Sequence, residues 1–228
     1  MITWPRDVFI PEAEEWQRPG VFTSGGRLAS GAMRGGRTDG GGLWTLNQEG
    51  IILDIPGIKL WRSLHSSIGD GVREFIVPMC EAGFRPMPAG DWTTSGIPHS
   101  DGTFHSDGTG YSQGVIEASF AATALRRATT VQIDMTVSSA LIGGERLSVD
   151  HPTERRRMYE IGEVLDVTGT VYTVTIEPPL REAITEIGTA ADFNNPGLVM
   201  IVADPNSMGV KVTSGWWAEK SIAFVEAP

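Results

Sequence analysis

The segment from Pro56 to Pro78 constrains the fold most, because it contains the clearest amphipathic helix in a chain that otherwise favours strands and turns. Four apolar residues share one stripe of a helix: Leu60, Trp61, Leu64 and Ile68. The pattern predicts a helix over residues 58–69 that begins after Pro56-Gly57, ends at Gly69-Asp70-Gly71 and is followed by a strand from Val72 to Val77. A lone helix between strands must bury its stripe on a sheet, so we expect Trp61 and Leu64 to anchor it to a β-sandwich or β-barrel.

The composition indicates many short elements joined by tight turns. The chain has 228 residues, including 28 glycines and 14 prolines, which suits one large or two small domains of mainly β structure. The formal net charge of -10 argues against a general nucleic-acid-binding protein, because phosphate binding needs clustered Lys and Arg. Cys80 is the single cysteine, which excludes intramolecular disulfides and Cys-rich metal clusters.

The apolar stretches of the sequence are short. None approaches the length that spans a bilayer, and residues 1–11 lack the apolar core of a signal peptide. We therefore expect no membrane segment, and a protein that is made and folded in a cytoplasm.

Strand patterns occupy most of the remaining chain. They are Asp7–Ile10, Leu43–Leu46, Gly50–Ile55, Thr129–Met135, Arg146–Val149, Met158–Val164, Val171–Ile176, Leu198–Ala203 and Trp217–Val225. The segment Val115–Arg127 fits either a helix or a strand, and the alternation of its apolar residues slightly favours two adjacent strands bent at Arg126-Arg127. We expect His151–Arg157 to form a polar hairpin.

The Gly-rich segment Ser24–Gly42 carries Arg27, Arg34 and Arg37. It has few apolar side chains, so we predict a long mobile hairpin loop that a neighbouring protein can order. Gly31–Thr38 has the spacing of a phosphate-binding P-loop, with Arg37 where the lysine would stand, but the sequence that follows does not favour the helix that such a loop requires. We therefore expect no nucleotide site there.

The motif HSDGT occurs twice, at His99–Thr103 and His105–Thr109. Its histidines and aspartates could bind a divalent metal, because imidazole and carboxylate are common ligands. Asp-Gly is also a frequent tight-turn pair. We predict two successive turns, without a metal or a cofactor.

Recognisable catalytic motifs are absent from the sequence. It has no G-x-S-x-G, no H-E-x-x-H, no dinucleotide fingerprint after a strand and no EF-hand loop. We predict a protein that is not an enzyme; the alternative is an enzyme that cleaves cell-wall polymer, because a carboxylate pair for glycoside cleavage is defined by a distance and leaves no sequence motif. Asp54, Glu117 and Asp134 are individually compatible with surface or capping carboxylates. The seven tryptophans, Trp216-Trp217 among them, could stack on sugars, but Trp is also favoured in cores and interfaces, which is our preferred interpretation.

The C-terminal half carries motifs that resemble those of a known group of proteins. They are GGERLSV (Gly143–Val149), MYEIGEV (Met158–Val164), TVTIEPPLREAI (Thr173–Ile184), GTAADFNNPGLVMIVA (Gly188–Ala203) and FVEA (Phe224–Ala227). The sequence resembles distal tail or tail-tip proteins of long non-contractile-tailed bacteriophages, and the resemblance covers most of the chain beyond about residue 55.

The resemblance implies a structural virion protein at the distal end of the tail, assembled in the host cytoplasm. Its implied fold is a ring-forming β-sandwich or β-barrel domain with one packed α-helix, at residues 1–90 and 212–228, plus an inserted small β-barrel-like domain at residues 91–211. The implied partners are further copies in a hexameric or pseudo-hexameric ring, the tail tube protein, the tail hub or tip proteins, and DNA that passes through the lumen. The alternative function is a carbohydrate-binding module that recognises a receptor.

Within this scheme we expect two groups of structural or interface residues besides the helix anchors. Pro178, Pro179, Leu180 and Arg181 would form a turn that positions the inserted domain. Arg27, Arg34 and Arg37 would lie on a loop that contacts a neighbouring subunit.

Overall fold

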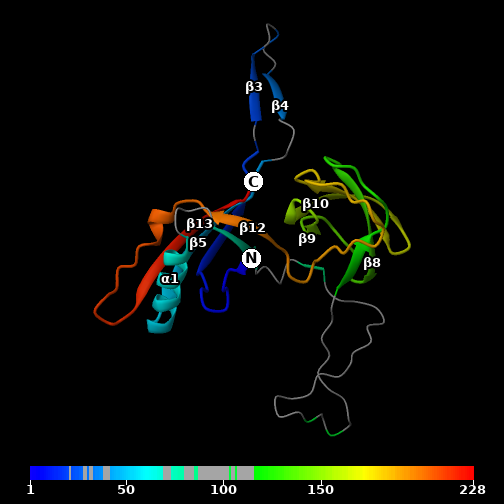
Figure 1. The fold of residues 1–228 in the computed structure, drawn as a ribbon. Helices are drawn as coiled ribbons and strands as arrows, with labels where there is room; N and C mark the ends of the chain where they lie inside the picture. The colour runs from blue at the N-terminus through cyan, green and yellow to red at the C-terminus, as the bar shows by residue number, and fades with distance from the viewer. Residues whose placement is uncertain are drawn as a thin grey trace. The chain divides into compact units, whose positions relative to one another are not determined.

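A computed structural model describes residues 1–20, 22–27, 30, 33–37, 42–68, 73–79, 85–86, 103, 106 and 116–228. The described chain is mainly β, with one α-helix and one short 3-10 helix, which confirms the predicted class (Figure 1). It divides into two compact units: unit 1 contains Met1–Pro78 and Gly197–Pro228, and unit 2 contains Met79–Pro196. In the sequence, unit 2 is therefore inserted into unit 1.

Unit 1 contains a six-stranded sheet with the order β1-β6-β12-β13-β5-β2. β1 is parallel to β6, and the other neighbours are antiparallel. The strands are β1 (Ile2–Thr3), β6 (Glu74–Pro78), β12 (Gly197–Val202), β13 (Ala218–Glu226), β5 (Thr45–Leu53) and β2 (Ala13–Gln17). β5 is continuous from Thr45 to Leu53, so the strands predicted at Leu43–Leu46 and Gly50–Ile55 belong to one strand, in which Gly50 has a φ of +69°.

Two sequence-based expectations for unit 1 are wrong. Residues Asp7–Ile10 do not form a strand, because the Pro5 carbonyl accepts hydrogen bonds from the N–H groups of Val8 (3.2 Å) and Phe9 (2.9 Å) and closes a turn. The predicted boundary at residue 211 placed β12 in the inserted domain, whereas β12 pairs with β6 and β13 of unit 1. The sequence shows where a strand lies, but the sheet that this strand joins depends on pairing with strands far away in the chain.

The helix α1 (Ile55–Ile68) begins before Pro56, not after Gly57 as predicted. Asp54 caps it: the side-chain Oδ1 accepts a hydrogen bond from Gly57 N, and the carbonyl accepts one from Ile58 N, both at 2.8 Å. Pro56 is tolerated in the first turn, where the N–H groups have no intrahelical acceptor. Asp54 is thus the capping carboxylate that the sequence allowed, and the predicted helix end lies outside the described residues.

An aromatic cluster forms the core of unit 1 around Trp4. Its ring centroid lies 5.1 Å from that of Phe9, 5.8 Å from Trp61, 5.7 Å from Phe75 and 4.9 Å from Phe224. Trp61 comes from α1, and its Nε1 donates a hydrogen bond to the carbonyl of Met208 (2.8 Å) in the short 3-10 helix η2 (Pro205–Met208). The core therefore joins the start of the chain, the helix, the sheet and η2.

β3 (Phe22–Arg27) and β4 (Met33–Arg37) form a separate two-stranded antiparallel sheet where the sequence predicts a long hairpin loop. Phe22 pairs with Arg37, and Arg27 pairs with Met33. The hairpin is confirmed but its arms are strands, because backbone pairing needs no apolar side chains. The backbones of Arg27, Arg34 and Arg37 lie in these strands, and their side chains are outside the described part of the chain.

Unit 2 contains a curled five-stranded antiparallel sheet with the order β7-β8-β11-β10-β9 (Figure 1). The strands are β7 (Glu117–Phe120), β8 (Thr130–Val137), β11 (Val171–Glu177), β10 (Arg155–Thr168) and β9 (Arg146–His151). β7 confirms the strand interpretation of its segment, and the helical alternative is wrong. β7 ends at Phe120 and residues 121–127 do not extend it, although Ala124 makes an isolated bridge with Ile184. The second strand, predicted to follow the bend at Arg126-Arg127, is β8.

The segment Thr189–Asp192 connects the two outer strands of this sheet. It bridges β7 through Ser119 and Ala190, and it bridges β9 through Ser148 and Asp192. The N–H of Ala191 donates to the Ala118 carbonyl at 3.0 Å, and Ser148 and Asp192 exchange two backbone hydrogen bonds of 2.9 Å. These bridges connect the outer strands of the curled sheet and give unit 2 the barrel-like form that the resemblance implies.

Candidate functional site

Six of the nine residues predicted to be structural or interfacial have side chains that the structure describes, and four of these six are buried: Trp61, Leu64, Pro178 and Leu180. Trp61 is fully buried in unit 1, Leu64 is buried beside it, and Leu180 is buried in the core of unit 2. The Pro178–Arg181 turn is tied to unit 2, because the Leu180 carbonyl accepts from Arg127 N (2.8 Å) and the Tyr159 hydroxyl accepts from Arg181 N (3.0 Å). These contacts place the described side chains within the fold of their own units.

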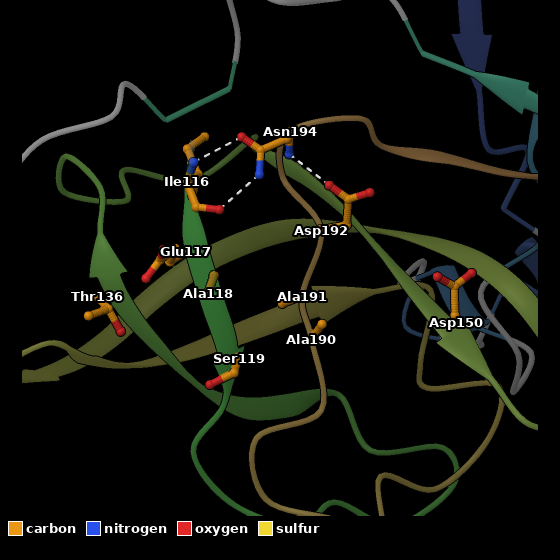
Figure 2. Close-up of a pocket in the computed structure, with 10 residues that line it drawn as sticks. All are labelled: Ile116, Glu117, Ala118, Ser119, Thr136, Asp150, Ala190, Ala191, Asp192 and Asn194. Atoms are coloured by element: carbon orange, nitrogen blue, oxygen red, sulfur yellow. Dashed lines mark hydrogen bonds between the residues drawn. The ribbon is translucent and has the colours of Figure 1, made fainter. Parts of the chain in front are cut away.

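A concavity of about 550 Å³ lies on unit 2, where the closing segment meets β7. Figure 2 shows carboxylates, an amide, hydroxyls and small apolar residues around it. The lining residues are Ile116, Glu117, Ala118, Ser119, Thr136, Asp150, Ala190, Ala191, Asp192 and Asn194. Sequence reasoning considered Glu117 alone, because these residues come from segments that only the closed barrel brings together.

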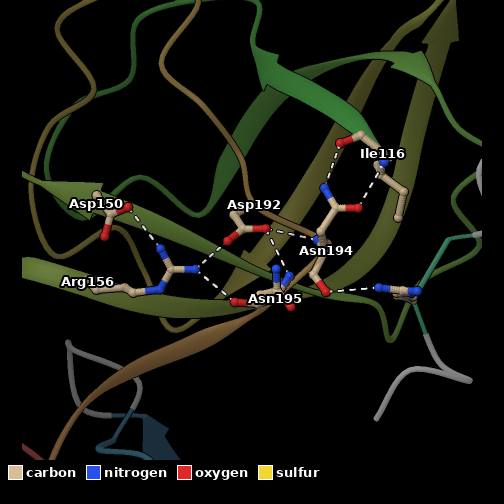
Figure 3. Close-up of polar contacts among 7 residues, drawn as sticks. Ile116, Asp150, Arg156, Asp192, Asn194 and Asn195 are labelled. Atoms are coloured by element: carbon tan, nitrogen blue, oxygen red, sulfur yellow. Dashed lines mark hydrogen bonds and ion pairs between the residues drawn. The ribbon is translucent and has the colours of Figure 1, made fainter. Parts of the chain in front are cut away.

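Asn194 holds the start of β7 at one end of this concavity. Its Oδ1 accepts a hydrogen bond from Ile116 N (2.9 Å), and its Nδ2 donates one to the Ile116 carbonyl (2.8 Å), as Figure 3 shows. The amide side chain thus takes the place of a neighbouring strand. The carbonyl of Asn194 also accepts from Arg85 Nη1 at 3.0 Å, so the segments that enter and leave the barrel are joined here.

Asp192 and Arg156 complete this network (Figure 3). Asp192 Oδ1 accepts from the N–H groups of Asn194 (2.9 Å) and Asn195 (3.0 Å), and its Oδ2 is ion-paired with the Arg156 guanidinium. Arg156 also pairs with Asp150 Oδ2 (2.9 Å) and donates to the Asn195 carbonyl (2.8 Å). Because both carboxylates face the same guanidinium and Asp192 uses both oxygens within the fold, this cluster is suited to holding the barrel closed.

A second concavity of about 340 Å³ is lined in part by the buried His151. His151 Nε2 lies 2.7 Å from the Tyr159 hydroxyl, which also receives the hydrogen bond from Arg181 N. Burial is the main reason that the pKa of His151 is lowered, and the nearby Arg157 lowers it further against the opposing effect of Glu182. The pair therefore contains a neutral imidazole at pH 7 and connects β9, β10 and the Pro178–Arg181 turn.

Glu182 stabilises the hairpin between β9 and β10. Its Oε2 accepts hydrogen bonds from the backbone N–H groups of Glu154 (2.9 Å) and Thr153 (3.0 Å). These bonds favour the charged form and lower the pKa of Glu182, with Glu154 contributing most. The predicted polar hairpin at His151–Arg157 is confirmed, and its turn is held by a carboxylate from another part of unit 2.

The two main sheets differ in whether a further segment bridges their outer strands. In unit 2, β7 and β9 are joined through Thr189–Asp192. In unit 1, the sheet ends in β1 on one side and β2 on the other. Thr3 on β1 and Ala13, Glu15 and Gln17 on β2 are exposed. The terminal strands of unit 1 are therefore the candidate surface for strand addition.

Among the described residues, no group of three or more His, Cys, Asp and Glu side chains could hold a metal ion. The metal ligands considered in the HSDGT motifs, His99, Asp101, His105 and Asp107, lie outside the described residues. Where the structure describes the chain, it contains no helix long and apolar enough to cross a membrane.

Comparison with known sequences adds no further assignment: no protein-family model matches the chain, and no curated protein matches it.

Proposed function

We propose that this chain is a structural protein of a bacteriophage virion, the distal component that joins the tail tube to the hub or tip proteins of a long non-contractile tail. It acts as a hexameric or pseudo-hexameric ring, leaves a central opening for DNA and performs no catalysis. It assembles in the host cytoplasm and functions at the distal end of the tail.

The observation that carries the proposal is the presence of two different terminal strands on the sheet of unit 1, β1 and β2. Terminal strands present backbone groups to which a further strand can bind. If β2 of one copy binds beside β1 of the next, the contact joins two different surfaces, and a heterologous contact of this kind closes into a ring when its rotation permits.

Two sequence features agree with this role. The motifs in the C-terminal half resemble those of distal tail and tail-tip proteins. The net charge of -10 suits a ring around DNA, because carboxylates along its bore would repel phosphates and prevent DNA from sticking.

A cysteine-pairing experiment tests the proposed contact. In a Cys80→Ser background, the double variant Thr3→Cys, Glu15→Cys places one thiol on each terminal strand, at positions that are both exposed. We expect mild oxidation to produce a ladder of covalent oligomers that ends at six chains of 24.6 kDa each. Each single-cysteine variant should stop at a dimer, because it has only one thiol per chain.

Light scattering after gel filtration, together with negative-stain electron microscopy, tests the ring itself. A six-fold mass and annular particles are expected. A monomer at every concentration would contradict the proposed function. If rings form but oxidation gives no ladder of covalent oligomers, the proposed ring is supported and the proposed β1–β2 contact is wrong.

A further inference from the structure

The loop between η2 and β13 ends in a tight turn that carries two exposed tryptophans. The N–H of Trp216 donates to the Thr213 carbonyl (3.0 Å), and the N–H and Oγ1 of Thr213 each donate to the Trp217 carbonyl (both 3.0 Å). These bonds enclose three residues, Ser214, Gly215 and Trp216, in a loop that leads directly into β13. Trp216 is 69% exposed and Trp217 is 42% exposed.

Trp216 occupies a backbone conformation that a bulky residue rarely adopts. Its φ is +59°, the left-handed region. In three-residue hairpin loops this position normally carries glycine, because a Cβ there crowds the carbonyl oxygen that follows. The left-handed conformation costs a non-glycine residue about 1–2 kcal/mol. Burial of apolar surface does little to offset this conformational cost, because most of the Trp216 side chain remains in solvent.

The second tryptophan is supported by the turn. A Cβ added to Gly215 would lie 3.0 Å from Trp217 Cδ1 and 3.2 Å from its Nε1, so the pyrrole edge of the indole rests against the glycine backbone. Glycine at position 215 thus permits a close approach of the ring. The turn thus exposes the Trp216 indole at the cost of backbone strain and holds the Trp217 indole against the backbone of Gly215. An external ligand explains this arrangement better than a contribution to the stability of unit 1 does.

The surroundings of the two indoles limit the chemistry of that ligand. The flanking exposed residues are polar: Lys211, Thr213, Ser214 and Glu219. The Lys220 ammonium is already bonded to the carbonyls of Ser207 (2.9 Å) and Gly209 (2.8 Å). Within residues 211–219 the exposed large apolar side chains are Trp216 and Trp217, and the exposed Ile52 pairs with Glu219. This is a small apolar area, whereas a protein-binding hot spot lies within a larger, desolvated contact area. The net charge of -10 disfavours an anionic lipid surface or nucleic acid.

We propose that the Trp216–Trp217 turn binds a neutral polysaccharide, with the apolar C–H face of a hexopyranose ring stacked on an exposed indole. The hydroxyl of Ser214 and the carboxylate of Glu219 supply hydrogen-bonding partners for the sugar hydroxyl groups at the rim. Such a site combines an apolar surface with a few polar groups, the usual composition of a small-ligand site. It binds its ligand whether or not the chain forms a ring, so it does not depend on the proposed function.

Native affinity electrophoresis of the full chain tests the site, with gels that contain dextran, mannan, galactan or O-polysaccharide released from lipopolysaccharide. We expect at least one polysaccharide to retard the chain. The double variant Trp216→Ala, Trp217→Ala should weaken that interaction at least about tenfold, the equivalent of 1.4 kcal/mol. If no polysaccharide retards the wild-type chain, or if it retards the double variant equally, the proposal is wrong.

Two further variants separate a ligand site from a structural role. Trp216→Gly should raise the melting temperature of unit 1 by about 4 °C or more, because it removes backbone strain, and should also weaken binding. Ile52→Ser is the matched control: Ile52 is 59% exposed and pairs with Glu219 on β13, two residues from Trp217. It should bind like the wild type.

The same variants show which other role the two tryptophans have if they do not bind a polysaccharide. A lower melting temperature for Trp216→Gly would assign Trp216 to the fold. Equal weakening by Ile52→Ser would indicate a broader apolar contact. A loss of oligomer mass in the tryptophan variants, without any polysaccharide binding by the wild type, would assign the turn to subunit contacts. Each of these results would overturn the polysaccharide site. The first two leave the ring untested, whereas a loss of oligomer mass would also show that the wild-type chain is an oligomer.

Discussion

The packing of α1 makes a quantitative prediction at Trp61. This side chain is fully buried, its ring centroid lies 5.2 Å from that of Phe9 and 5.8 Å from that of Trp4, and its Nε1 donates to the Met208 carbonyl. Trp61→Ala removes the ring and leaves a cavity, which should lower the free energy of unfolding of unit 1 by about 3–5 kcal/mol.

Trp61→Phe is the more informative change, because it retains an aromatic ring and removes the indole N–H. The Met208 carbonyl loses this donor, which costs about 1–3 kcal/mol, and the smaller ring leaves part of the site unfilled. We therefore expect a loss of about 2 kcal/mol or more.

Urea unfolding followed by tryptophan fluorescence measures this loss, because six of the seven tryptophans belong to unit 1. Trp217→Phe is the matched control: the same chemical change at a residue that is 42% exposed should alter stability by less than about 0.5 kcal/mol. If Trp61→Phe costs no more than Trp217→Phe, the buried indole does not hold α1 on η2 as argued.

Three further predictions concern a cap, a turn and pH. Asp54→Ala should destabilise unit 1 by about 1 kcal/mol in urea unfolding, because α1 loses its capping bond. Gly143→Ala should lower the melting temperature of unit 2 more than Gly144→Ala: their φ values are +99° and +90°, but only the Cβ at 143 meets a carbonyl oxygen of β10, at 2.7 Å. The unfolding free energy of unit 2 should fall as pH drops below about 6.5, because the lowered pKa of His151 means that the unfolded chain is protonated there before the folded one. It should fall again below about 4.5, because the lowered pKa of Glu182 has the same consequence for that carboxylate. His151→Gln should abolish the first fall and Glu182→Gln the second; a pH profile that neither change alters would refute the assignment.

Features that depend on local periodicity could be predicted from the sequence. The period-2 pattern at Trp217–Val225 predicts a strand that the structure places at Ala218–Glu226, and the stripe containing Trp61 and Leu64 predicts the buried face of α1. Asp54 shows where such reasoning loses precision, since a helix start depends on which side chain bonds the first free N–H groups.

The candidate ligand-binding turn at Trp216-Trp217 was harder to predict from the sequence. Trp216 and Trp217 are consecutive, so the sequence drew attention to them, but it favoured a core or interface role that is confirmed for the buried Trp4, Trp44 and Trp61. The positive φ that distinguishes Trp216 has no sequence signal, because the adjacent Gly215 is the residue that pattern reasoning assigns to a tight turn.

The sequence by itself determined the mainly β class, the single amphipathic helix and most strand positions, because each depends on side chains within a few residues of one another. The tertiary structure alone decided that β12 pairs with β6 and β13, that Thr189–Asp192 closes the barrel and that Trp4 lies at the centre of the aromatic core. Those outcomes depend on backbone hydrogen bonds and ring contacts between residues far apart in the chain. Local periodicity carries no information about which distant strand supplies the partner.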